Sequence, residues 1–158
     1  MSKEGFYLNY TIVRGWGQSE DELVSFDKAL LSAGIEKFNL VPVSSILPYR
    51  CEYQSFEKLR ELQWGTVIHV ILAKTIVKGA YQVSAGLCSV KEEDSGRVFV
   101  VEYAGKVNEK ECRRILEKRA RLVAEARDFE ISDLEFIIES KKGRKNLYTC
   151  VIVAICLW

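Results

Sequence analysis

The sequence contains few of the residues that mark several common classes of protein. Its 158 residues include only two prolines and one histidine, while apolar residues make up 48%. This balance is typical of a chain that folds around a buried core, and it excludes a disordered or proline-rich protein. We expect one domain over residues 1–158, because single domains commonly run to about 100–200 residues.

An excess of charge of one sign is also missing. Lys and Arg number 23 and Asp and Glu number 22, so the formal net charge is +1. A chain this balanced has no global field to attract nucleic acid or an anionic membrane. The basic run at 141–145 has no interleaved aromatic residues, and a hairpin turn explains it better than a nucleic-acid contact. We therefore expect no nucleic-acid partner.

The cysteines do not form a recognisable framework. They are odd in number and show no C-x-x-C pair, which argues against a disulfide scaffold or a bound structural metal; they are Cys51, Cys88, Cys112, Cys150 and Cys156. Residues 1–5 lack the apolar run of a signal peptide, and the longest apolar run, 148–158, is shorter than the roughly 20 residues of a membrane helix. These absences predict a cytoplasmic protein with reduced thiols and no membrane segment.

Hydrophobic periodicity predicts two helices, 20–33 and 109–127, the first capped by Ser19 with Glu22 and the second by Asn108 with Glu111. The first helix carries an apolar stripe of Leu23, Phe26, Leu30 and Leu31, and the basic residues of the second are interpreted as a solvated face. Strands are predicted at 6–14, 38–43, 66–77, 80–91, 98–103, 131–140 and 146–158.

Turn residues predict how these strands are connected. Strands 66–77 and 80–91 are expected to form a hairpin around Gly79, as are the last two strands around 141–145. A polar loop at 92–96 predicts a further hairpin, and 49–62 is expected to be a loop with a short helical turn. The resulting fold class is α+β, an αββα-type sandwich of mainly antiparallel sheets covered by helices.

The segment 38–48 combines structural and chemical signals. It begins as an apolar, β-prone run that predicts a buried strand, and it ends at Ser44 and Ser45, three residues before Pro48. The Ser45 hydroxyl can attack the adjacent Ser44 carbonyl, and a serine that cleaves its own backbone in this way can become a pyruvoyl group. For two adjacent serines considered alone, a plain turn is the favoured interpretation.

Three further positions leave alternatives open. Asp27 lies at the border of the apolar stripe of helix 20–33, where a surface acid is favoured over one that points into a cleft. Glu102 ends an apolar strand, so it either lies at the mouth of a site or faces water. His69 is interpreted as a strand histidine, although a Ser-His-Asp relay stays open. The Gly15-x-Gly17 loop is a weak anion site because acids follow it.

The chain resembles the pyruvoyl-dependent arginine decarboxylases in the order and spacing of short motifs from residue 15 to the final strand. These motifs are Gly15-x-Gly17-x-Ser19-Glu20, Ser25-Phe26-Asp27-x-Ala29-Leu30-Leu31, Ala33-Gly34-Ile35, Asn39-Leu40, Val43-Ser44-Ser45-Ile46-Leu47-Pro48 and Glu102-Tyr103-x-Gly105-Lys106. Residues 49–64 depart from the family pattern, with Tyr49 in place of a second proline. This difference bears on the pocket wall and on substrate preference.

The resemblance implies that the chain is a proenzyme cleaved between Ser44 and Ser45 into residues 1–44 and 45–158. Ser45 would become the pyruvoyl group, so that neither a metal nor pyridoxal phosphate is needed. The resemblance also assigns the oxyanion donor of processing to Asn39, the proton donor to Glu102, and substrate binding to Asp27, Leu30 and Ser44.

By the same resemblance, the reaction is the conversion of L-arginine to agmatine and CO2 through an imine to the pyruvoyl group. The assembly implied is a homotrimer with each site at a subunit interface. Two alternatives remain: a pyruvoyl-dependent decarboxylase of another cationic amino acid, and an uncleaved, non-catalytic trimeric homologue.

Overall fold

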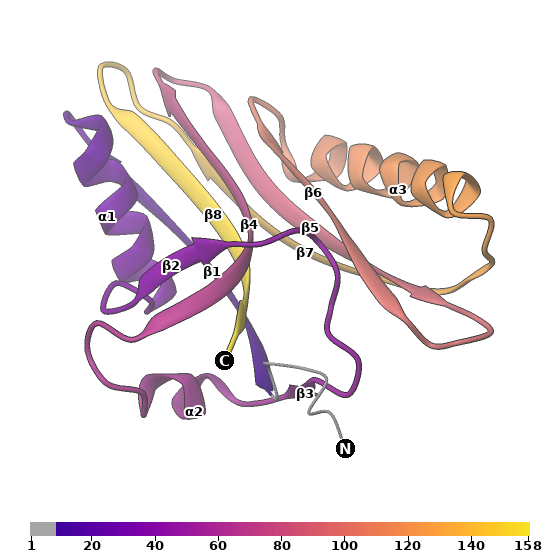
Figure 1. Cartoon of the computed structure of the whole chain (residues 1–158). Helices are drawn as coiled ribbons and strands as arrows, with labels where there is room; N and C mark the ends of the chain where they lie inside the picture. Colours follow the sequence, from indigo (N-terminus) through magenta and orange to yellow (C-terminus); the bar gives the residue numbers. More distant parts are fainter. Residues whose placement is uncertain (1–8) are drawn as a thin grey trace.

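The computed structural model describes residues 9–158, so the start of the strand predicted at 6–14 and the prediction for residues 1–5 lie outside the described residues. The described part contains three helices and eight strands (Figure 1). In chain order they are β1 Asn9–Ser19, α1 Glu22–Ala33, β2 Asn39–Pro42, β3 Glu52–Tyr53, α2 Phe56–Arg60, β4 Val67–Lys78, β5 Gln82–Glu92, β6 Val98–Gly105, α3 Glu109–Ala126, β7 Ile131–Lys142 and β8 Tyr148–Leu157.

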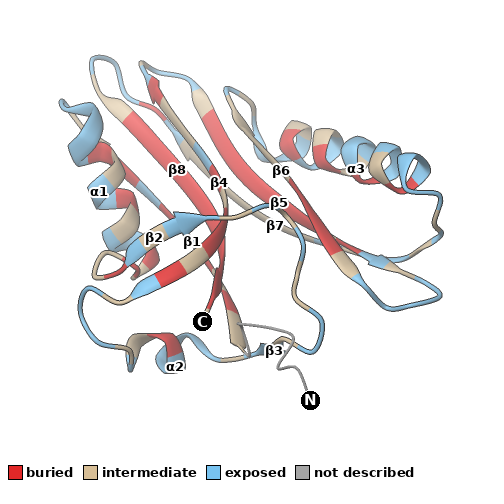
Figure 2. Ribbon diagram, in the orientation of Figure 1, coloured by how far each residue is buried: buried red, intermediate tan, exposed pale blue. Residues whose placement is uncertain are grey.

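The strands form two sheets that face each other, with a helix on each outer face. The first sheet has the order β2-β4-β8-β1-β3 and the second the order β6-β5-β7. Helix α1 covers the first sheet and α3 the second (Figure 1). Buried apolar residues form one cluster in each of the three spaces between the four layers. Figure 2 marks buried residues in both sheets and in α1 and α3. The predicted αββα sandwich of mainly antiparallel sheets is therefore confirmed.

The final strand, β8, lies at the centre of the first sheet between β4 and β1. One face points toward α1 and the other toward the second sheet, so every residue of β8 after Tyr148 is buried. A continuous apolar sequence suits a strand that is covered on both faces. The prediction of a buried strand at the end of the chain is confirmed.

Two of the three predicted hairpins are wrong. Strands β4 and β5 lie in different sheets, and so do β7 and β8. Their connections cross from one layer to the other and are tied together, because Gly143 N–H donates to the Tyr81 carbonyl at 2.7 Å and Gly79 N–H donates to the Leu147 carbonyl at 3.0 Å. The β5–β6 hairpin is confirmed. A turn sequence shows where the chain reverses but not whether it returns to the same sheet.

Helix α1 packs against β1 through small residues. Gly15 and Gly17 belong to β1, not to a loop, and a Cβ atom on Gly17 would lie 2.3 Å from the Ser25 carbonyl oxygen. The buried face of α1 is accordingly Ser25, Ala29 and Ala33. The predicted stripe was wrong in its outer members, because large side chains do not fit where the helix lies this close to the strand; Leu23 is 74% and Leu31 55% exposed.

The helix caps differ in how well they follow the prediction. In α1 the N-cap is Asp21, whose side chain accepts from Val24 N–H at 3.0 Å, so the predicted cap of Ser19 with Glu22 is wrong. In α3 the Asn108 side chain accepts from Glu111 N–H at 2.9 Å, which confirms Asn108 as the N-cap. Asp21 and Ser19 are both good capping residues, and β1 extends through Ser19, so the helix begins later.

Strand β2 is an edge strand, although a buried strand was predicted here. Among the strands of residues 9–158 it pairs with β4 alone, in parallel, and all of its residues except Leu40 are exposed. Pro42 has no N–H to donate and is therefore tolerated at a sheet edge. Segment 49–62 contains the predicted short helical turn as α2, and also the two-residue strand β3.

Candidate active site

The chain leaves the first sheet after β2 and passes to the edge of the second sheet, and we call residues 43–48 the crossover segment. Its backbone pairs with β6: Val100 N–H donates to the Ser45 carbonyl at 2.8 Å, and Leu47 N–H donates to the Val98 carbonyl at 3.0 Å. These bonds hold the two adjacent serines beside β6, where the two sheets meet.

Ser45 and Glu102 are in direct contact. The Ser45 hydroxyl donates a hydrogen bond to the Glu102 carboxylate, although the residues are 57 positions apart in the sequence. Both side chains are partly buried. Among residues 9–158 no lysine or arginine forms an ion pair with Glu102. The carboxylate is therefore placed to accept a proton from the hydroxyl.

The carbonyl next to Ser45 also has a donor. Ile46 N–H donates to the Ser44 carbonyl oxygen at 3.0 Å. A backbone N–H at this oxygen can stabilise negative charge that develops there during attack on the carbonyl carbon. Sequence reasoning missed this donor, since any residue except proline supplies the same group.

A pocket of about 550 Å³ contains both serines and Glu102. Its walls are the crossover segment, strand β6 and helix α3, which covers β6 (Figure 1). The helix contributes Arg119, Leu122 and Val123 to the lining, and its C-cap residue, Arg127, lines the pocket as well. The site therefore combines a hydroxyl, a carboxylate and two guanidinium groups with apolar walls.

The two arginines were missed from the sequence, where the basic residues of this helix were interpreted as a solvated face. The interpretation of an exposed face is confirmed, because Arg114, Arg119, Arg121 and Arg127 are all exposed. Arg114 and Arg121 pair with glutamates on this surface. Arg119 instead donates to the Glu102 backbone carbonyl, and its guanidinium lies 5.1 Å from the Tyr103 ring centroid. The signal available was spacing, because residues 119, 123 and 127 follow one stripe of a helix.

The other predicted site residues do not join this pocket within one chain. Asn39 is exposed, and its side-chain amide donates to the Gly65 carbonyl at 2.8 Å. Asp27 is exposed and Leu30 half-buried on α1, which covers the outer face of the first sheet, and neither lines the pocket. His69 lies in β4 and does not line it either. The structure thus brings together only Ser44, Ser45 and Glu102.

Cysteine chemistry does not contribute to the site. Burial raises the pKa of the Cys112 thiol to about 11 and those of Cys88, Cys150 and Cys156 to about 12. Thiols with such pKa values stay protonated at neutral pH and are poor nucleophiles. The described residues include no cluster of three or more His, Cys, Asp or Glu suited to a metal ion. None of the described helices is long and apolar enough to span a membrane.

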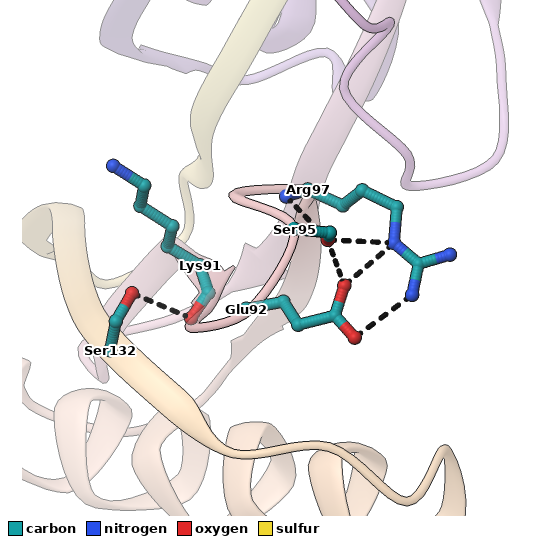
Figure 3. Close-up of polar contacts among 5 residues, drawn as sticks. All are labelled: Lys91, Glu92, Ser95, Arg97 and Ser132. Atoms are coloured by element: carbon teal, nitrogen blue, oxygen red, sulfur yellow. Dashed lines mark hydrogen bonds and ion pairs between the residues drawn. The ribbon is translucent and has the colours of Figure 1, made fainter.

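A second serine–glutamate contact lies in the turn between β5 and β6 (Figure 3). Ser95 donates to the Glu92 carboxylate, which also accepts N–H bonds from Arg97 at 2.6 and 2.8 Å. The hydrogen bonds from Arg97 and Ser95 lower the pKa of Glu92 to about 2. This carboxylate stays ionised over most of the pH range, so it is a poor proton acceptor.

Comparisons with known proteins agree with these observations. A family model described as pyruvoyl-dependent arginine decarboxylase matches residues 9–158. The chain is 29% identical to the pyruvoyl-dependent arginine decarboxylase of Methanopyrus kandleri over 98% of this chain and 99% of that protein. It is also similar to two such decarboxylases of Archaeoglobus fulgidus. One is 39% identical over 65% of this chain and 64% of its own length. The other is 37% identical over 68% of this chain and 70% of its own length.

Proposed function

The chain belongs to the pyruvoyl-dependent arginine decarboxylase family, and from this membership we propose that it cleaves itself and then converts L-arginine to agmatine and CO2. The observation that carries the proposal is the hydrogen bond from the Ser45 hydroxyl to the Glu102 carboxylate. It places a nucleophile, a proton acceptor and the Ser44 carbonyl at one point of the chain.

Self-processing begins at Ser45. Its hydroxyl oxygen attacks the Ser44 carbonyl carbon while Glu102 takes the hydroxyl proton, and Ile46 N–H donates to the carbonyl oxygen. The new C–O bond replaces the C–N bond, giving an ester and a free amine. Loss of the Ser45 α-proton then expels the Ser44 carboxylate as a new C-terminus. Hydration of the remaining dehydroalanine releases ammonia and leaves a pyruvoyl group.

The second oxyanion donor in this proposal is the Asn39 side-chain amide. Its support is the position of Asn39 in the family motif. In the single chain this amide donates to the Gly65 carbonyl at 2.8 Å. The donor role therefore requires the amide to exchange this partner for the Ser44 carbonyl.

The residues around Ser45 suit a pyruvoyl group, because a pocket of about 550 Å³ surrounds this position. When formed, the group supplies a carbonyl that binds the substrate amine and accepts the electron pair left as CO2 departs. Glu102 then gives a proton to the substrate α-carbon, which returns the pair to carbon. The scheme needs no metal and no pyridoxal phosphate.

Substrate selection in this proposal comes from α1. A carboxylate accepts two parallel N–H bonds from a guanidinium group, so Asp27 is assigned to the far end of arginine, with Leu30 beside it. Both residues lie outside the Ser45 pocket of their own chain. This separation supports a homotrimer in which α1 of one subunit completes the site of the next. All five cysteines are free thiols, which supports a cytoplasmic location.

The test is a substrate panel on the purified protein. We expect L-arginine to yield CO2 and agmatine with a higher kcat/KM than L-lysine or L-ornithine. Equal turnover of another cationic amino acid would favour a decarboxylase of different specificity. A folded, uncleaved chain without turnover would favour a non-catalytic subunit.

A further inference from the structure

One wall of the pocket around Ser45 is basic, and its arginines have no role in the reaction proposed above. Arg119 and Val123 lie on α3, and Arg127 is its C-cap residue, whose N–H donates to the Val123 carbonyl at 3.0 Å; the three follow each other at intervals of four and line the pocket. Side chains at this spacing lie on one face of a helix. The two guanidinium groups therefore share the space into which Ser45 and Glu102 point.

The hydrogen-bond donors of these two arginines are used differently. Arg119 donates to the Glu102 backbone carbonyl and stacks on Tyr103, which fixes its position. The Arg127 guanidinium lies 5.4 Å from the Phe99 ring centroid, and within residues 9–158 its side chain makes no hydrogen bond or ion pair. Arg127 thus offers a full set of planar donors to whatever occupies the pocket.

The charge of the pocket determines which end of the substrate it accepts. Its charged lining groups are Arg119, Arg127 and Glu102. Cleavage would add the Ser44 carboxylate, but Glu102 must carry a proton before it can donate one, so one positive charge remains. Like charge disfavours the guanidinium end of arginine in this pocket, whereas the α-carboxylate end is favoured.

We propose that Arg127 recognises the α-carboxylate of the substrate, an inference that rests on the proposed function. Arg119 holds the same wall of the pocket in place. Arg127 is then the counterpart of Asp27, which takes the guanidinium group at the other end. Because agmatine has lost the carboxylate, Arg127 binds the substrate and does not retain the product.

The role predicts a particular kinetic signature. The carboxylate loses its charge as CO2 leaves, so an ion pair with Arg127 is stronger in the bound substrate than in the transition state. Removing such an interaction raises KM without lowering kcat. Arg127 should therefore contribute to substrate affinity and to the distinction between arginine and agmatine.

The experiment compares Arg127→Gln with the matched control Arg121→Gln, which alters a nearby arginine of α3 that pairs with Glu117. For each cleaved protein, normalised to pyruvoyl content, KM for L-arginine and the inhibition constant of agmatine are measured. We expect Arg127→Gln to raise KM about tenfold, with kcat not lowered and agmatine inhibition unchanged or stronger. Arg127→Lys should give a smaller rise, and Arg121→Gln should match the wild type.

A second measurement needs no variant. L-argininamide, which lacks the carboxylate charge, should bind the wild-type enzyme about tenfold more weakly than L-arginine. Equal binding, or a parallel change of arginine and agmatine affinity in Arg127→Gln, would overturn the role of Arg127 while leaving the decarboxylase intact. A parallel change of the arginine and agmatine affinities is also expected if Arg127 pairs only with the Ser44 carboxylate. A wild-type protein that releases no CO2 would instead refute the proposed function.

Discussion

Two serine–glutamate contacts within this chain look alike locally but differ in what surrounds them. Ser95 is exposed in the turn after β5, three positions from Glu92, which ends β5; the Glu92 side chain is 12% exposed, and its carboxylate is also held by Arg97 (Figure 3). Ser45 and Glu102 are 57 positions apart and partly buried, and the hydroxyl supplies the one side-chain hydrogen bond to this carboxylate within residues 9–158.

The comparison teaches that a hydroxyl bonded to a carboxylate is not by itself a reactive pair. Arg97 stabilises the charged form of Glu92, which weakens it as a proton acceptor. Within residues 9–158 no cation forms an ion pair with the Glu102 carboxylate, and its serine adjoins a carbonyl that already accepts a hydrogen bond from Ile46. The chemistry thus depends on what contacts each pair directly: a guanidinium bonded to the carboxylate at one site, and a peptide carbonyl next to the hydroxyl at the other.

The largest expected difference is between a variant without the Ser45 hydroxyl and a variant without the Ser95 hydroxyl. We expect Ser45→Ala to abolish cleavage, because it removes the hydroxyl that attacks the Ser44 carbonyl in the proposed reaction. Ser95→Ala should be cleaved to the same extent as the wild type. Denaturing gel electrophoresis of the purified variants measures the cleaved fraction. A cleaved, carbonyl-reactive Ser45→Ala protein would contradict the assignment.

Exchanging the carboxylates for amides sharpens the comparison further. We expect Glu102→Gln to slow both maturation and turnover by roughly 100-fold or more, the usual scale of general acid–base catalysis. Glu92→Gln should mature and turn over normally, since it changes only the surface turn. The cleavage time course and agmatine release measure the two effects separately. Normal maturation of Glu102→Gln would show that Glu102 does not act on Ser45.

A third carboxylate, outside both pairs, tests the far end of the substrate. We expect Asp27→Ala to be cleaved normally but to lose about tenfold or more in kcat/KM for L-arginine, while lysine turnover changes less. The matched control is Glu22→Gln on the same helix, which should behave as wild type. The comparison is made by competition between the two amino acids. Undiminished arginine preference in Asp27→Ala would refute its role.

The smallest effect concerns the pH dependence of the surface pair. The pKa of Glu92 is lowered from 4.5 to about 2 in the folded chain. The pair therefore stabilises the fold above pH 4.5 and loses this contribution as the pH falls toward 2. We expect Glu92→Gln to have a slightly lower Tm at neutral pH, with the difference shrinking as the pH falls below 4.5. A constant difference would contradict the ionised pair.

Much of the fold could be predicted from local patterns. The position of α3, its Asn108 cap and the burial of β8 follow from periodicity and capping residues in the sequence itself. The failed hairpins depended instead on which distant strand each segment meets, and local sequence carries no such information. The face of α1 was misjudged because its partner in β1 is a glycine pair that admits only small side chains.

The candidate site also has some features that could be predicted from the sequence and others that depend on distant parts of the fold. Ser45 and Glu102 each break an apolar pattern, but their roles could be proposed only through the family resemblance, and their contact is a result of the fold. Asp27 and Leu30 lie apart from them within one chain, an arrangement that the proposed intersubunit site would require. Arg127 was overlooked because a basic residue on a helix has the same sequence signature whether it faces solvent or a pocket.

The central claim is that Ser45, and not Ser95, is converted by the chain itself. Its most direct test is the intact mass of the purified wild-type protein under denaturing conditions, measured with a carbonyl-reactive probe. We predict two fragments, residues 1–44 and 45–158, with the larger one labelled at its N-terminus. A single unlabelled chain from a well-folded preparation would contradict the account and would favour a non-catalytic subunit.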